Sequence, residues 1–160
     1  MTATPFFYWL RRKVRPLTRA LQFFLINSYY HDGKSQDLIY GTGCSFNNAI
    51  FNTASGKIYI GDSVIFGYSV MVLTGKHQFV EGRRISLNTN ECSKQEVPLS
   101  GYDIQIGDGS WVSSGAILIG NAKVGKNSIV CAGAVVTKRF SDYSIIAGCP
   151  AVQIGSTLNL

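Results

Sequence analysis

The stretch from Ile106 to Lys138, IGDGSWVSSGAILIGNAKVGKNSIVCAGAVVTK, decides the fold because it repeats with a period of six residues. Every sixth residue is aliphatic, and a small residue follows four places after each of the first five. The aliphatic positions are Ile106, Val112, Leu118, Val124, Val130 and Val136, and the small ones are Ser110, Ala116, Ala122, Ser128 and Ala134. In a chain that is 46% apolar, the two patterns together have a chance probability on the order of one in a million.

A period of six suits neither an α-helix, with its 3.6 residues per turn, nor a simple two-faced strand. It is typical of short strands that are joined by tight turns and wind around an axis, so that each aliphatic side chain points into a shared core. We expect the small residues where the chain bends inward, and Gly107 and Gly125 in the turns. The repeat therefore predicts a mainly β solenoid.

The same rhythm occurs upstream in residues 60–64 and 66–70, but it is out of phase with the second block. From Val72 to Ile106 there are 34 residues, which is not a multiple of six. The segment from about 74 to 102 is polar and aperiodic, and we interpret it as an excursion loop, a kind of segment that often carries function. Its first turn brings His77 to the edge of the predicted core.

Length, composition and charge limit the functional classes. The 160 residues, with 46% apolar and 15% charged side chains, predict one globular domain with a core. The net charge of +6 is concentrated at the N-terminus, because residues 1–34 hold six Lys and Arg against one Asp, whereas residues 35–160 hold nine against eight acids. A nucleic-acid footprint would spread over a binding face, so no nucleic-acid partner is expected.

Cysteine usage and hydropathy predict a cytoplasmic protein. The four cysteines form no C-x-x-C pair, and charges at 11–15 interrupt the one apolar stretch that a signal peptide would need. Apolar runs such as Phe23–Ile26 are far shorter than the roughly 20 residues that span a bilayer. We therefore expect free thiols and no membrane-spanning segment.

Residues 40–155 resemble the hexapeptide-repeat acyltransferases, most closely the sugar O-acetyltransferase branch with its maltose, galactoside and nodulation-factor enzymes. The resemblance rests on residues 106–112, 132–138 (AGAVVTK), 147–151 (AGCPA) and 75–77 (GKH). It implies a left-handed parallel β-helix of triangular section with about 18 residues per coil, against the usual right-handed crossover rule. We accordingly expect an N-terminal basic helical segment, 1–36, before a β-helix acyltransferase domain, 37–160, with the excursion at about 74–102.

The resemblance also implies a homotrimer with active sites in the clefts between neighbouring solenoids, where acetyl-CoA lies along the coils and no metal is used. The reaction it implies is transfer of an acetyl group from acetyl-CoA to a sugar hydroxyl, in the synthesis of cell-surface polysaccharide. Such a transfer needs a base for the hydroxyl proton, and an ordinary imidazole, with a pKa of about 6.5, is largely neutral at cytoplasmic pH. His77 matches the catalytic histidine of the family, whereas His31 lies before the repeat and matches nothing.

The resemblance assigns five residues to coenzyme A. The backbone N–H of Ser114 would stabilise the oxyanion and contact the pantetheine arm, and Ala132 would meet the arm through its backbone. Thr137 and Lys138 lie where the family holds the nucleotide end, and Trp111 matches a tryptophan that lines the cleft. The alternatives are an exposed solenoid charge for Lys138 and plain packing for Trp111.

Acceptor residues are less sharply indicated. Asn47 falls at the position of an acceptor-binding asparagine in the family, although Asn48 and Asn52 lie close by. Arg83 and Arg84 are interpreted as solvated loop charges, with an acidic acceptor group as the alternative. The sequence departs from the family at Gln78-Phe79, at Ser113-Ser114, where Ile-Gly is usual, and in the length of the excursion, and these departures bear on the identity of the acceptor.

The N-terminal segment has an apolar helical face opposite its arginines. Its members are Phe6, Leu10, Val14, Leu17, Leu21 and Phe24, and Pro16 should kink the helix. Residues 1–34 suit either of two roles: covering the open end of the solenoid, which we favour, or lying on the inner face of an anionic membrane.

Other functions remain open at this stage. The same base would serve N-acetylation of an amino-sugar or acetylation of serine or a xenobiotic, and a non-catalytic solenoid is a further alternative. A zinc carbonic anhydrase on a similar helix needs three histidines, but only one of the two here lies in the repeat region.

Overall fold

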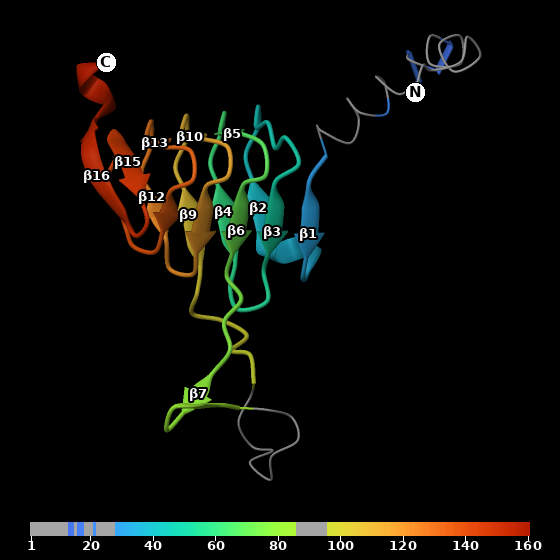
Figure 1. Cartoon of the computed structure of the whole chain (residues 1–160), viewed down its shortest axis with the longest axis vertical. Helices are drawn as coiled ribbons and strands as arrows, with labels where there is room; N and C mark the ends of the chain where they lie inside the picture. The colour runs from blue at the N-terminus through green and yellow to red at the C-terminus, as the bar shows by residue number, and fades with distance from the viewer. Residues whose placement is uncertain (1–12, 15, 18–20, 22–27, 86–95) are drawn as a thin grey trace, which may run out of the picture.

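The computed structural model describes residues 28–85 and 96–160, together with residues 13, 14, 16, 17 and 21 of the preceding segment. Three parallel sheets form the body of the molecule (Figure 1). Sheet A contains β1 (Tyr30–Asp32), β3 (Ile50–Asn52), β6 (Met71–Leu73), β11 (Ile117–Ile119) and β14 (Val135–Val136). Sheet B contains β2 (Leu38–Tyr40), β4 (Ile58–Ile60), β9 (Ile104–Ile106) and β12 (Lys123–Val124). Sheet C contains β5 (Ile65–Phe66), β10 (Trp111–Val112), β13 (Ile129–Val130), β15 (Ser144–Gly148) and the antiparallel β16 (Ala151–Ser156).

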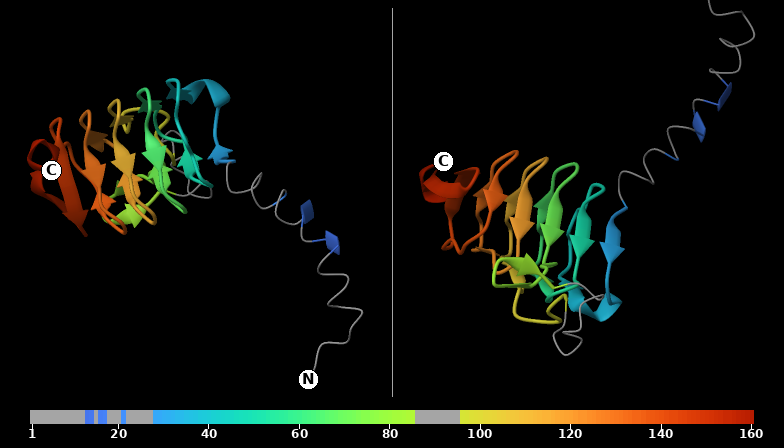
Figure 2. Two further views of the ribbon diagram at one scale, coloured as in Figure 1. Left: turned by 90° about the horizontal axis from the view of Figure 1, so that it is seen from above. Right: turned by 60° about the horizontal axis from the view of Figure 1, so that its bottom comes forward.

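The chain passes through sheets A, B and C in turn. Each full turn adds one strand to every sheet, so the coils stack along one axis (Figure 2). In the first coil Ser45 stands in for a strand of sheet C by bridging to Ile65, and in the fifth Arg139 does so for sheet B by bridging to Lys123. Five coils result. The three edges of this prism are named here by the sheets they join: A–B, B–C and C–A.

The hexad prediction is confirmed. All six aliphatic residues of the repeat and all five small residues are at most 2% exposed. From Leu118 to Val136, which are partners in register, is 18 positions, whereas 46 separate Val72 from its partner Leu118. The second interval is longer by 28 residues, so a single insertion explains the phase shift between the two blocks.

The B–C edge shows why the turns need glycine and aspartate. A Cβ on Gly107 would lie 2.5 Å from the Lys126 nitrogen of the next coil, so only glycine allows the coils to approach so closely. Aspartates then link one coil to the next: Asp108 accepts the Asp62 N–H at 3.1 Å through Oδ1. Its other oxygen pairs with the Lys126 ammonium at 2.8 Å, which lowers the pKa of Asp108 and raises that of Lys126.

Aromatic side chains fill the N-terminal end of the core. Phe46 packs between Tyr29 and Tyr40, with ring centroids 5.0 Å from each, and contacts Phe51 and Phe66 behind them. A hydrogen bond with Tyr40 and partial burial raise the pKa of Tyr29. Tyr29 and Tyr40 keep 37% and 47% of their surface exposed, so this end of the solenoid is filled but not fully covered.

The predicted N-terminal helix lies mostly outside the described residues, and no α-helix has bounds within the described part of the chain. Described side chains of this segment, such as Leu17 and Leu21, are exposed. Strand β1 already pairs with β3, so the coils begin before residue 37. The division into segments 1–36 and 37–160 stays a prediction. No helix among the described residues is long and apolar enough to cross a membrane.

The excursion leaves sheet A after β6 and returns to sheet B at β9, as the sequence predicts (Figure 1). It is not wholly irregular, because β7 (Phe79–Val80) and β8 (Arg83–Arg84) form an antiparallel hairpin. The hairpin turns at Glu81 and Gly82, with φ of 49° and 77°. Two central residues with positive φ favour a tight two-residue turn, and the Glu-Gly pair is the sequence signal for it. Residues 86–95 lie outside the described part. Two short 3₁₀ turns, η1 (Ser35–Asp37) and η2 (Thr157–Asn159), complete the elements.

Candidate active site

His77 lies at the start of the excursion on the A–B edge. Polar contacts with the preceding coil hold the backbone just before it. The Asn52 side chain accepts the Gly75 N–H at 3.1 Å, and its amide donates to Asp32 at 3.1 Å. The Ser55 hydroxyl accepts the Lys76 N–H at 3.1 Å. These contacts fix the backbone of the two residues before His77, so the excursion is anchored where the histidine begins it.

The His77 ring faces a carboxylate. Its Nδ1 lies 3.5 Å from Oε1 of Glu96, which also accepts a hydrogen bond from Arg84 at 3.0 Å. The Glu96 carbonyl accepts the Gln78 N–H at 2.9 Å, so the backbone brings the two segments of the excursion together. The imidazole is about half exposed. A carboxylate at Nδ1 favours the tautomer with its proton on that nitrogen, which leaves Nε2 as the accepting base.

His31, by contrast, is a structural residue. It pairs in register with the buried Phe51, and its Nε2 is 2.9 Å from the Thr53 hydroxyl. The excursion is anchored on Asn52, the residue next to Thr53, and no contact among the described residues joins His31 to His77.

Trp111, Ser114 and Ala132 lie on or beside a different edge, the C–A edge. Trp111 is on β10 of sheet C with about half of its side chain exposed, so it does not pack in the core. The Ser114 hydroxyl accepts the Tyr68 N–H at 3.0 Å, which explains a serine in this turn. Within the described chain, the N–H groups of Ser114 and Ala132 donate to no other group, although the Gly133 N–H bonds to the Ser114 carbonyl at 3.1 Å. Two free donors are thus stacked one coil apart.

Asn47 occupies the same edge in the first coil. It has a φ of 41°, in the left-handed region, and its amide donates to the Phe66 carbonyl at 2.8 Å. This bond gives Asn47 a structural role in the turn.

Thr137 and Lys138 follow β14 and therefore lie on the A–B edge, two coils beyond His77. Both are exposed. The Lys138 ammonium rests over the Phe140 ring, 5.5 Å from its centroid, a cation–π contact that a phosphate would have to compete with.

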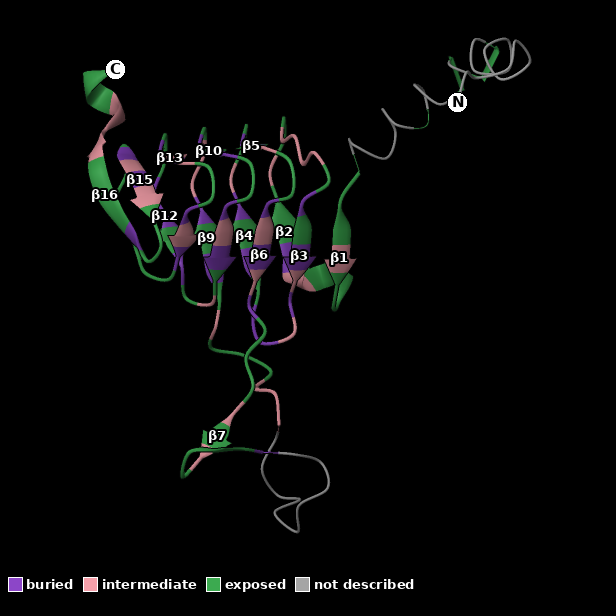
Figure 3. Cartoon of the chain, viewed as in Figure 1, coloured by how far each residue is buried: buried purple, intermediate pink, exposed green. Residues whose placement is uncertain are grey.

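The site residues predicted from the sequence thus divide between two edges of one prism. One edge carries His77, Thr137 and Lys138, and the other carries Asn47, Trp111, Ser114 and Ala132. Sheet A separates the two edges. One side of a coil has about six residues, so the sheet is up to about 20 Å wide. One chain does not bring His77 together with the free N–H groups of Ser114 and Ala132. Buried residues on the strands of the prism form the core between the two edges (Figure 3).

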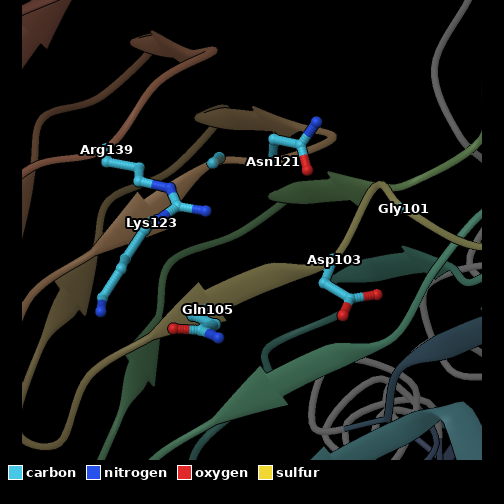
Figure 4. A pocket seen from close by; sticks show the side chains of 7 residues that line it. Gly101, Asp103, Gln105, Asn121, Lys123 and Arg139 are labelled. Carbon is cyan, nitrogen blue, oxygen red and sulfur yellow. The ribbon is translucent and has the colours of Figure 1, made fainter.

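A pocket that no sequence pattern indicates lies on the outer face of sheet B, with a volume of about 170 Å³. Lys123, Arg139, Asn121, Gln105 and Asp103 are among its lining residues (Figure 4). A larger, shallower trough of about 470 Å³ shares Gln105 and Lys123 with it and runs along the same sheet. Among the described residues, no cluster of three or more His, Cys, Asp or Glu could hold a metal ion.

Residues 103–138 match the family model described as bacterial transferase hexapeptide (six repeats). The chain is similar to a galactoside O-acetyltransferase of Lactococcus lactis, at 25% identity over 129 residues, which is 81% of this chain and 58% of that protein. The chain therefore spans less than two thirds of that relative.

Two solved structures have the same fold. One is a maltose O-acetyltransferase of Clostridium difficile, with a TM-score of 0.52 and 21% identity, over 92% of this chain and 88% of the other. The second is a hexapeptide-repeat acetyltransferase of Vibrio cholerae in complex with acetyl coenzyme A, with a TM-score of 0.51 and 20% identity, over 89% and 77%. In the register of its coils and the match of its repeats, the chain is similar to the hexapeptide-repeat acyltransferases.

Proposed function

We propose that this protein transfers an acetyl group from acetyl-CoA to a hydroxyl of a sugar, with His77 as the general base. The observation that carries the proposal is the half-exposed imidazole of His77, which follows an anchored backbone segment and has the Glu96 carboxylate at its Nδ1. The galactoside and maltose O-acetyltransferases to which the chain is similar support a sugar acceptor. The structure with acetyl coenzyme A supports the donor.

In this mechanism Nε2 of His77 removes the proton of the acceptor hydroxyl as its oxygen attacks the thioester carbonyl. The oxyanion that develops is stabilised by the free N–H of Ser114. When the carbon–sulfur bond breaks, the imidazolium returns its proton to the thiolate of coenzyme A, and the acetyl ester is released.

A second copy of the chain completes the site. The base and the Ser114 donor lie on opposite edges of sheet A, so neighbouring copies that meet through this sheet would bring unlike edges together. One of its two outward rows is apolar from end to end: Tyr30, Ile50, Met71, Ile117 and Val135. The other row begins with the polar Asp32 and Asn52 and continues with Leu73 and Ile119. Tyr30 is 64% and Ile50 38% exposed in the single chain, as expected for residues that neighbours cover. A cyclic trimer with sheet A toward its axis fits this pattern.

The donor would then lie along the cleft with its thioester at His77 and its nucleotide end at Thr137 and Lys138, two coils away on the same edge. The neighbour's Trp111, Ser114 and Ala132 would form the other wall. The neighbour's Asn47, in the first coil, lies at the opposite end of the cleft from the nucleotide, where the acceptor would bind.

Several finer assignments belong to the same proposal. They are the left-handed winding of the coils, a cytoplasmic location, a role in surface-polysaccharide synthesis, and the covering of the solenoid end by residues 1–34. N-acetylation of an amino-sugar and acetylation of serine or a xenobiotic use the same base, and a 50-residue match at 40% identity to a serine acetyltransferase of Arabidopsis thaliana keeps serine in the acceptor screen.

The test is thiol release from acetyl-CoA in the presence of a panel of sugars, amino-sugars and serine. We expect His77→Ala to lower kcat by about 10²- to 10⁴-fold, since it removes the base. The control is His31→Ala. It removes the second imidazole of the chain, which lies outside the excursion, and it should keep most of the activity. Equal activity in the two variants would refute the assignment of His77, and turnover of serine alone would refute the sugar acceptor.

A further inference from the structure

The outer face of sheet B changes character along the solenoid. Its outward row runs from Ile39 and Tyr59 in the first coils through Gln105 to Lys123 and Arg139 in the last two. Lys123 and Arg139 are direct cross-strand partners, and both are exposed. Like charges placed opposite each other on neighbouring strands destabilise a sheet. The pair therefore breaks a local rule, as functional sites often do.

No acidic side chain compensates this pair among the described residues. The ion pairs found there are those of His77 and Arg84 with Glu96 and of Lys126 with Asp108. Asp103 lines the same pocket, but its Oδ1 accepts the Lys57 N–H at 2.8 Å. Asp103 comes two positions before Gln105, which is the partner of Lys123 in the preceding coil. In Figure 4 the two cations lie at one end of the pocket and Asp103 at the other.

The pocket has room for an anion beside the two cations. Its volume of about 170 Å³ corresponds to roughly five or six waters. The Arg139 guanidinium offers a planar fork that matches two oxygens of a phosphate, and the Lys123 ammonium adds a point charge on the adjacent strand. Asn121, on the A–B edge, supplies a neutral polar group at the rim.

The position of this pocket points to the donor rather than the acceptor. The Lys123 N–H donates to the Lys138 carbonyl at 3.3 Å, so the pocket directly adjoins the edge to which the nucleotide end of the donor is assigned. The acceptor would bind at the opposite end of the cleft. We propose that Lys123 and Arg139 bind the phosphate groups of coenzyme A, in a site on sheet B that continues the cleft; this inference rests on the proposed function.

Calorimetric titration of the full-length protein with coenzyme A tests the proposal, with Lys123→Gln, Arg139→Gln and the double variant. Both side chains point outward, so these changes leave the core intact. We expect a loss of about 10-fold in affinity for each variant and about 100-fold for the double variant, and no change for pantetheine, which lacks the nucleotide phosphates. Lys34→Gln, an equal change of charge before the second strand of the first coil, is the control and should bind coenzyme A as the wild type does.

Two outcomes would overturn the proposal. One is wild-type affinity for coenzyme A in the double variant. The other is a double variant that keeps this affinity but loses binding of a hexose phosphate, which would assign the pocket to a phosphorylated acceptor. Because binding is measured without turnover, a failure of the acetyl-transfer proposal at His77 would show itself separately, as coenzyme A binding without thiol release.

Discussion

At the scale of single residues, Glu96 is the side chain whose role most depends on geometry. Its Oε1 faces Nδ1 of His77 and accepts from Arg84. We expect Glu96→Gln to lower kcat about tenfold and to leave the KM for acetyl-CoA unchanged, because an amide holds the imidazole tautomer less firmly but touches no substrate. Steady-state kinetics with both substrates measures this split.

The matched control for Glu96 is Glu81→Gln, which removes the same charge from the hairpin turn of the same excursion. It should leave kcat as in the wild type, and neither change should alter the melting temperature, since neither side chain is in the core. A fall in the melting temperature of the Glu96 variant that matches its loss of activity would instead mean that Glu96 only holds the loop together.

At the scale of elements, the turns of the B–C edge limit how closely the coils stack. We expect Gly107→Ala to destabilise the fold by about 1–3 kcal/mol, because the added methyl group would meet the Lys126 backbone of the next coil. Gly155→Ala is the control, since a Cβ there meets the Ile145 side chain at an ordinary 3.4 Å. Chemical denaturation of both variants measures the difference, and equal stabilities would show that the coils can separate at little cost.

The hexad period predicts which side chains point inward, and the structure places all of them there, because one buried position per side is a local property of the chain. It does not by itself assign an edge. Ser114 and Ala132 are 18 positions apart and share an edge, whereas Thr137 comes five positions later, nearly one side further on. Counting in steps of a whole coil would have revealed the division of the site.

No sequence pattern indicates Glu96 or Lys123, and the physical reasons differ. Glu96 lies at the end of an aperiodic excursion, and the backbone contact between Gln78 and Glu96 brings it to His77. Lys123 lies at an outward position of the repeat, where any polar residue is tolerated, so its pairing with Arg139 appears only once the coils are stacked. Contacts between segments that are far apart in the sequence determine both placements, and no local sequence pattern encodes these contacts.

At the scale of the whole molecule, the division of the site between two edges predicts complementation between inactive subunits. His77→Ala disables one edge, and Ala132→Trp should block the other by filling the pantetheine path from an exposed turn. Each variant alone should be inactive. If the edges meet between copies, each cyclic trimer that contains both variants keeps about a third of its sites with both partners intact.

Co-expression of the two variants with different affinity tags, followed by two-step purification and thiol-release assays, measures this recovery. The control is co-expression of a chain that carries both substitutions with the His77→Ala chain, where every site lacks its base and no activity should return. If the mixed oligomers of the single variants also stay inactive, the two edges do not face each other across an interface. The base and the donors on opposite sides of sheet A would then have to serve separate purposes.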